Sequence, residues 1–259
     1  YLNAFNIFLL TNVLGPMKQA YLNMPVISTF VLFMGAGYII GGIRSCLIVG
    51  SLFLFIALSE YWDRTLITLY MATFAVGVSA FSGIIVGSLC SQNDFASKTI
   101  LSICDFFQTF PSFIYLIPVI LLFGITDTSV MIAAIVYASV PATRYTVEGL
   151  RSVPTSLHDA GSMSGVSKIQ RWRLIDIPLA LPHIMLGINQ TVIFALMMIV
   201  LGALIGTEDL GQLIMGSLSR PNGAGIGFTL GIFISFICLA VDNLIRTWAD
   251  ERKKLLGIQ

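Results

Sequence analysis

Long apolar segments dominate the chain. Six of them approach or exceed the roughly 20 residues that cross a hydrocarbon core; they are 26–43, 65–90, 99–123, 128–147, 183–206 and 227–247. A seventh, 46–58, is shorter and lies between Arg44 and Glu60. Backbone groups in lipid need internal partners, and no segment alternates with the period of two that a barrel strand requires. The pattern therefore predicts an all-α polytopic membrane bundle with about seven transmembrane helices.

Composition agrees with a membrane protein. The chain is 56% hydrophobic and only 10% charged, whereas soluble domains carry about 25% charged residues. The net charge of +1 favours no polyanionic partner, so nucleic acid is not expected. Four scattered cysteines, each in an apolar run, are interpreted as small buried hydrophobes rather than metal or redox groups. The opening 25 residues are short and interrupted, which predicts an interfacial helix.

Basic residues indicate which side faces the cytoplasm. If residues 156–182 lie inside, eleven of the fourteen Lys and Arg residues lie inside too. The eleven are Arg44, Lys98, Arg144, Arg151, Lys168, Arg171, Arg173, Arg246, Arg252, Lys253 and Lys254, and those left outside are Lys18, Arg64 and Arg220. An odd number of spans then predicts that the chain starts outside and ends inside.

The polar stretch 156–182 has the signals of two short helices. Ser156 with Asp159 three residues later forms the first capping-box pattern, and Gly165 suits the left-handed turn that ends a helix. Ser167 with Gln170 repeats the pattern, and Pro178 is expected to stop the second helix. We predict a cytoplasmic helix-turn-helix whose exposed apolar residues mark a docking surface. A plain loop folded back on the membrane is the alternative.

The spacing within this stretch resembles a known signature. Asp159-Ala160-Gly161, three residues, Gly165, nine residues, Ile175, one residue and Ile177-Pro178 match the E-A-A-x3-G-x9-I-x-L-P motif of permease subunits in ABC importers. Asp stands for Glu, Gly for the second Ala, and Ile for Leu. In that family the motif forms a coupling helix that seats in the ATPase subunit. The resemblance assigns ATPase coupling to Asp159, Ala160, Gly161, Gly165, Ile175 and Pro178. Trp172 joins this set because it is expected, like Ile175, to be an exposed side chain of the docking surface.

Further stretches resemble one branch of that family. "QTFPSFIYLIP", "GINQT" and "GTEDLGQLIMGSL" are similar to the permeases of glycine betaine, proline betaine and choline importers, over roughly residues 65–245. We expect an N-terminal part (1–64) with the interfacial helix and peripheral spans, a permease core (65–247) containing the coupling loop 148–182, and a cytoplasmic tail (248–259). The resemblance implies a multi-pass protein of the bacterial cytoplasmic membrane.

The same resemblance implies partners. The chain has no G-x-x-x-x-G-K-[ST] loop for phosphates, so ATP and Mg are expected on a separate ATPase, present in two copies. An extracytoplasmic substrate-binding protein and a second copy of the permease, forming a homodimer in the bilayer, complete the expected assembly. The chain itself is expected to bind no cofactor and to catalyse no reaction.

Candidate pathway residues are polar or aromatic groups within the spans. Asp105 is a costly intramembrane carboxylate, although Lys98 lies about two turns away near the cytoplasmic end, where Asp105 could be hydrated. Pro111 and Pro118 predict a kink in the span 99–123. The aromatic candidates around it for a methylated ammonium are Phe106, Phe110 and Tyr115. Asn189 and Gln190 either join helices by hydrogen bonds or face the conduit.

Two other functions remain open. An ion-coupled secondary transporter or channel would need intramembrane carboxylates for ion coupling or an inverted repeat, and neither is clear. A membrane-embedded enzyme would need a metal or acid–base cluster. His158 and His183 have neither metal-site spacing nor a neighbouring nucleophile.

Overall fold

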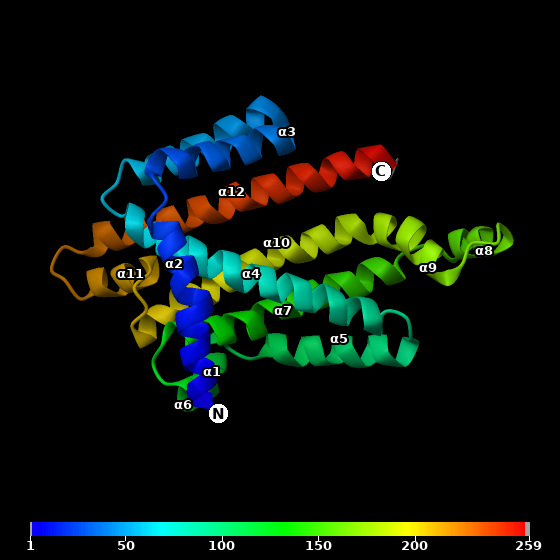
Figure 1. Ribbon diagram of the computed structural model, residues 1–259, viewed down its shortest axis with the longest axis horizontal. Coiled ribbons are helices and arrows are strands. Elements are labelled where there is room, and N and C mark those ends of the chain that lie inside the picture. The colour runs from blue at the N-terminus through cyan, green and yellow to red at the C-terminus, as the bar shows by residue number, and fades with distance from the viewer. Residues whose placement is uncertain (1, 257–259) are drawn as a thin grey trace.

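The computed structural model describes residues 2–256, and this part of the chain is helical without a strand. Long helices run side by side and carry a small helical hairpin at one end (Figure 1). The elements are α1 (Leu2–Leu9), η1 (Leu10–Leu14), α2 (Gly15–Leu22), α3 (Val26–Ala57), α4 (Trp62–Cys90), α5 (Asp94–Thr109), η2 (Ser112–Tyr115), α6 (Leu116–Phe123), α7 (Asp127–Arg151), α8 (Thr155–Met163), α9 (Lys168–Arg171), η3 (Trp172–Asp176), α10 (Ile177–Gly202), η4 (Ala203–Ile205), α11 (Leu210–Leu218) and α12 (Ala224–Leu256).

Helix α3 is folded back on itself. Its backbone leaves the helical region at Gly41 and Gly42, and Gly42 has φ 63° and ψ −158°, a conformation open almost only to glycine. The rings of Phe33 and Phe53 stack with centroids 4.1 Å apart, so the two arms pack against each other. Each arm has about 15 residues, or roughly 22 Å of helix, which is shorter than the roughly 30 Å hydrocarbon core.

The predicted span 99–123 is not one helix. Helix α5 ends at Thr109, and the following helical segment leaves at an angle of 105°. Phe110 is extended (ψ 139°), as expected of a residue that precedes a proline. Pro111 therefore produces the predicted break, whereas Pro118 lies in the first turn of α6 and causes no kink.

The predicted count of seven spans is not confirmed. In the described part of the chain five helices are long and apolar enough to cross a membrane, or up to six if the bent pair of α5 with η2 and α6 counts as one. The five are α4, α7, α12, the run from Lys168 to Ile205, and α3, whose length is counted over both of its arms. The count differs because two predicted segments, 26–43 and 46–58, lie in the folded α3.

Helix α7 packs closely against α4 and α10 through small residues. A Cβ atom placed on Gly83 of α4 would lie 2.5 Å from the Cβ of Ala142, and one on Gly187 of α10 would lie 2.7 Å from the Cβ of Tyr145. Ser79 also donates a hydrogen bond of 3.1 Å to the carbonyl of Ile135. Small residues allow such close backbone approach between membrane helices. They fix α7 in the middle of the bundle.

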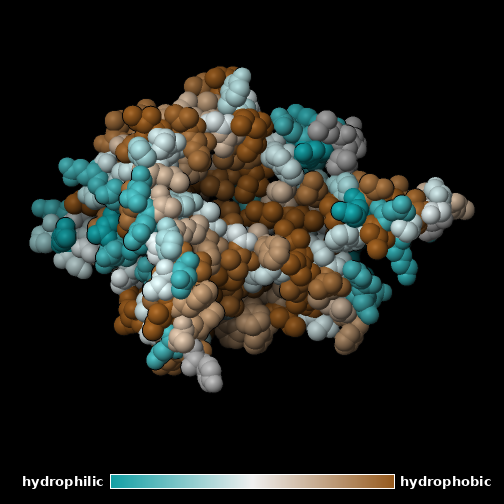
Figure 2. Space-filling model, in the orientation of Figure 1, coloured by the Kyte–Doolittle hydropathy of each residue, from teal (hydrophilic) through white to brown (hydrophobic). Residues whose placement is uncertain are grey.

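Polar residues gather at the two ends of the bundle. Hydrophobic side chains cover most of the middle of the face seen in Figure 2, and hydrophilic ones lie toward the ends. The hairpin and the end of α12 share one end (Figure 1), and the basic residues predicted inside lie toward it, with Arg144 deeper, about two turns before α7 ends. By the positive-inside rule this end faces the cytoplasm.

The outer end is held by a polar network. Lys18 of α2 lies 3.2 Å from Glu208 and 3.8 Å from Asp127, so it ties the N-terminal segment to the loop before α11 and to the start of α7. The run of α1, η1 and α2 crosses the outer part of the bundle (Figure 1). Asp209 caps α11 by accepting a hydrogen bond from the Gln212 amide, and burial raises the pKa of its carboxyl to about 6.

The close contact between α4 and α7 yields a stability prediction. Gly83→Ala places a methyl group 2.5 Å from the Cβ of Ala142 and 2.9 Å from two backbone atoms of α7. We expect the free energy of unfolding to fall by about 1–3 kcal/mol, because backbone must shift. Gly77→Ala on the same helix is the control, since its Cβ meets nothing within 4 Å. Thermal unfolding in detergent measures both; equal midpoints for the two variants would contradict this packing.

Candidate functional site: a coupling hairpin and a charged intramembrane cavity

The helical hairpin at the inner end consists of α8, α9 and η3. Gly165 has φ 72° and makes the turn between the helices, as predicted. The capping box of Ser167 and Gln170 is also confirmed: the Ser167 hydroxyl accepts from the Gln170 amide, and the Gln170 side chain accepts from the Ser167 amide. The first capping prediction is wrong, because α8 starts at Thr155 and Ser156 lies inside its first turn.

The prediction that Pro178 stops the second helix is wrong. The chain passes from α9 through the π-helical turn η3 straight into α10, where Pro178 lies in the first turn. In η3 the Ile177 amide donates to the carbonyl of Trp172, five residues back. The proline is accommodated for two reasons: the hydrogen bond is shifted to the π-helical spacing, and a missing amide costs little in the first turn of a helix. The hairpin is therefore joined to α10 without a loop.

Four of the signature residues line one groove of the hairpin. Ala160, Gly161, Ile175 and Pro178 lie around a cavity of about 470 Å³ between α8 and η3. A Cβ on Gly161 would lie 3.2 Å from the Cδ1 of Ile175, so a small residue permits this packing. Asp159 is exposed.

The expected docking side chains are only partly correct. Trp172 and Ile175 are half-buried within the hairpin instead of fully exposed. The apolar side chains that do face outward are Met163, Ile169 and Leu174, with exposed fractions of 91%, 71% and 71%. Sequence spacing alone could not separate Leu174 from Ile175, because the π-helical turn η3 shifts the face that each residue occupies.

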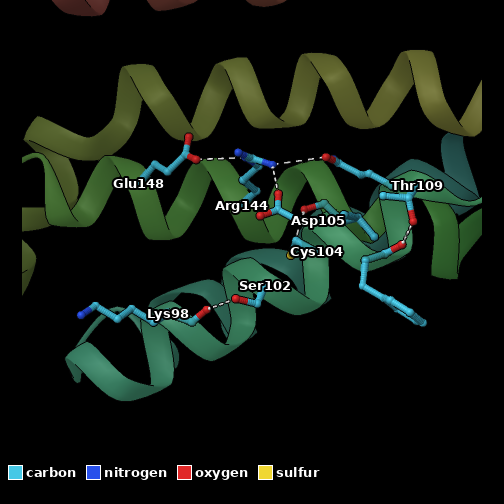
Figure 3. Close-up of polar contacts among 10 residues, drawn as sticks. Lys98, Ser102, Cys104, Asp105, Thr109, Arg144 and Glu148 are labelled. Atoms are coloured by element: carbon cyan, nitrogen blue, oxygen red, sulfur yellow. Dashed lines mark hydrogen bonds and ion pairs between the residues drawn. The ribbon is translucent and has the colours of Figure 1, made fainter.

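A charged cluster joins α5 to α7 (Figure 3). Arg144 lies at its centre, with its guanidinium 2.5 Å from Asp105 and 3.0 Å from Glu148. The same guanidinium donates to Gln108 at 3.3 Å. Charges within a membrane span are costly unless paired, and two carboxylates with one amide satisfy this one. Sequence analysis placed Asp105 among the candidates but missed Arg144 and Glu148, although their spacing of four residues on one helix was a usable signal.

A cavity of about 380 Å³ opens beside this cluster. It is lined by Gln108, Pro141, Arg144, Tyr145, Glu148, Gln190 and Phe194. Pro141 lies within α7 and has no amide to donate to the preceding turn. The cavity therefore offers a guanidinium, a carboxylate, two amide side chains and aromatic rings to a small polar molecule.

A chain of aromatic rings leads to the cavity. Its neighbouring rings have centroids 4.8–6.1 Å apart, in the order Phe110, Phe106, Phe107, Tyr115, Tyr137 and Phe194. The hydroxyl of Tyr115 donates to the carbonyl of Phe107, which holds η2 against α5. Four of these six rings belong to the segment around the predicted kink. Tyr137 and Phe194 were not predicted, because aromatic residues are common in spanning helices and carry no distinguishing pattern.

Adjacent residues of α10 have different surroundings. Gln190 lines the cavity, whereas Asn189 is buried and donates a 2.6 Å hydrogen bond to Asp242 of α12. Asp242 also accepts from Arg246 at 2.7 Å. Of the two alternatives left open by the sequence, Asn189 thus has the geometry of a helix-joining amide and Gln190 that of a cavity residue. No group of three or more His, Cys, Asp or Glu residues in the described chain could hold a metal ion.

An apolar helical bundle with a polar inner cavity and a helical hairpin at its cytoplasmic end has the build of a transporter's membrane subunit. Residues 79–254 match the family described as binding-protein-dependent transport system inner membrane component. The chain belongs to this family, and the predicted resemblance is confirmed. It is a multi-pass protein of the bacterial inner membrane.

Relatives in the family are named for small osmolytes. The chain is 62% identical over 99% of its length to the trimethylamine N-oxide transport system permease protein TmoV of Pelagibacter ubique, but covers 36% of that relative. It is 32% identical, over 78% of the chain and 71% of the relative, to the glycine betaine transport system permease protein OpuAB of Bacillus subtilis. With ProW of Escherichia coli, a glycine betaine/proline betaine permease, identity is 30% over 90% of the chain and 65% of the relative. The chain thus spans about a third of the length of the TmoV relatives.

The turn at Gly165 yields a prediction for coupling. Gly165→Glu is expected to leave membrane insertion intact but to abolish binding of an ATPase partner and uptake, because an unpaired carboxylate in a protein groove costs several kcal/mol. Gly165→Ala is the matched control. Its Cβ meets nothing within 4 Å, so it adds only the backbone strain of about 1 kcal/mol. Pull-down of the ATPase and solute uptake, each normalised to membrane abundance, are measured for both variants. If the Glu variant is abundant and still transports, the hairpin only connects α7 to α10 and has no coupling role.

Proposed function

We propose that this chain forms the membrane pathway of an ATP-driven importer for a small osmolyte with a methylated nitrogen. Glycine betaine, choline and related quaternary ammonium compounds are the substrate class, and trimethylamine N-oxide is similar in size and charge distribution. Two ATPase subunits, which bind ATP and Mg, would act at the hairpins of two copies of this chain. An extracytoplasmic binding protein would deliver the solute to the outer end.

The observation that carries this proposal is the cavity where the aromatic chain meets the charged cluster. Aromatic faces attract methylated cations, with about 0.5–2 kcal/mol for each contact. Phe194 ends the aromatic chain and lines the same cavity as Arg144 and Glu148. A zwitterion can therefore place its methylated nitrogen on the rings or near Glu148 while its anionic oxygen lies toward Arg144. The relatives named for trimethylamine N-oxide and glycine betaine support this solute class.

The hairpin supports coupling to a separate ATPase. Its apolar residues Met163, Ile169 and Leu174 are exposed at the cytoplasmic end, where the bundle does not cover them. Since η3 continues into α10, a force on the hairpin acts directly on the helix that carries Gln190 and Phe194. Closing of the ATPases would draw the two hairpins together and reorient the cavity by rigid-body motion.

The proposed pathway is tested at Tyr115, where one substitution removes the ring and another keeps it. Tyr115→Leu should weaken uptake by about 2- to 30-fold, the equivalent of about 0.5–2 kcal/mol, because the ring quadrupole is lost. Tyr115→Phe keeps the ring and removes only the hydroxyl that contacts Phe107, so it should retain most of the uptake. Initial rates with the cognate binding protein, across betaine, choline and trimethylamine N-oxide, measure the effect.

Controls separate the pathway from the importer mechanism. The transporter reconstituted without its ATPase should give no concentrative uptake of any solute, and uptake there would overturn ATP coupling. A Tyr115→Leu variant that is assembled and as fast as the wild type with every solute would instead remove the aromatic chain from the pathway.

A further inference from the structure

A second cavity lies at the inner membrane boundary, between the end of α4 and the helical hairpin. Its volume is about 760 Å³, and it is separate from the cavity beside Arg144 because the two share no lining residue. Its α4 side contributes the apolar side chains of Ile85 and Leu89, beside the polar Ser88, Ser91 and Gln92. The opposite wall carries Lys168, Arg171 and Trp172. Neither the solute pathway nor the signature groove uses these polar groups.

The polar wall is rich in hydrogen-bond donors. Among the residues that the structure describes, the buried Nε of Arg171 and the buried Nε1 of Trp172 have no hydrogen-bond acceptor. Arg171 Nε lies 3.6 Å from Asp176, within ion-pair range but beyond a normal hydrogen bond. Buried donors without acceptors are rare and costly, which indicates that a ligand supplies the missing acceptors.

Charge selects the ligand. Lys168 and Arg171 contribute two positive charges, and Asp176, 2.9 Å from His158, contributes one negative charge. The wall is therefore net positive, even with His158 neutral. An oxyanion with several acceptor oxygens fits such a set of donors better than a neutral group does.

The apolar side chains of α4 show that the ligand is amphipathic. Leu89 is 65% exposed and Ile85 43% exposed at the inner end of the apolar helix α4. The cavity therefore joins acyl-chain depth to the level of the headgroups. A tryptophan with an apolar ring and a polar nitrogen is typical of this boundary.

We propose that this cavity binds the phosphate group of an anionic phospholipid from the cytoplasmic leaflet. The phosphate accepts hydrogen bonds from Arg171 and Trp172 and pairs with Lys168, while an acyl chain lies along Ile85 and Leu89. The bound lipid links α4 to the start of α9 and η3, and so braces the hairpin against the bundle. This site is independent of which solute the pathway carries.

The test measures binding of phosphatidylglycerol and phosphatidylcholine to the purified transporter by native mass spectrometry. Phosphatidylglycerol is expected to bind more tightly than the zwitterionic lipid. The Lys168→Gln variant should weaken its binding about fivefold, and the added Arg171→Gln substitution about fivefold again, because each basic group near a membrane surface contributes about 1 kcal/mol. Millimolar inorganic phosphate should not displace the lipid.

Arg173→Gln is the matched control, since Arg173 is exposed in η3, directly after α9, but does not line the cavity. Its lipid binding should equal that of the wild type. Thermal unfolding verifies that each variant is folded, and the exposed Lys168→Gln change carries the test alone if the double variant does not assemble. Equal binding of the two lipids, no loss in Lys168→Gln, the same loss in Arg173→Gln, or displacement by inorganic phosphate would overturn the proposal.

Discussion

The Arg144 guanidinium lies within a membrane span, where a charge must be paired. Its partners come from two helices: Glu148 lies on the same helix, and Asp105 and Gln108 lie on α5. Several features of the fold serve this pairing. Pro111, three residues after Gln108, ends α5 at Thr109. Small residues bring α4 and α10 close to α7. The pairing therefore fixes both the position of α5 and the polarity of the cavity.

One continuous helical run connects the hairpin to the cavity. The run from Lys168 to Ile205 has no loop, so the hairpin cannot move far without moving Gln190 and Phe194. The π-helical turn η3 is an irregular point between them, and Arg171 and Asp176 pair across it. In the proposed cycle the hairpin transmits force, and the closely packed helices α4, α7 and α10 move as a body because tight cores resist gradual deformation.

Sequence patterns predicted two features of the hairpin that depend only on residues close together in the chain. Gly165 was predicted from its turn chemistry, and the Ser167–Gln170 capping box from spacing. Patterns failed where tertiary packing decides. The back-folding of α3 depends on contacts such as Phe33 with Phe53, and the continuation through Pro178 depends on a π-helical turn that apolar periodicity does not reveal. Asn189 and Gln190 look alike in sequence, and only the position of Asp242 distinguishes them.

The central claim, that solute passes through the cavity beside Arg144, is tested most directly by comparing those two neighbours. Gln190→Cys and Asn189→Cys are made after replacing Cys46, Cys90, Cys104 and Cys238, the four native cysteines. The whole transporter is then treated in proteoliposomes with a small charged methanethiosulfonate reagent. The account predicts that Cys at position 190 reacts and is protected by transported solute, whereas Cys at position 189, facing Asp242, reacts slowly with or without solute. Equal reaction at both positions, or no protection at 190, would contradict it.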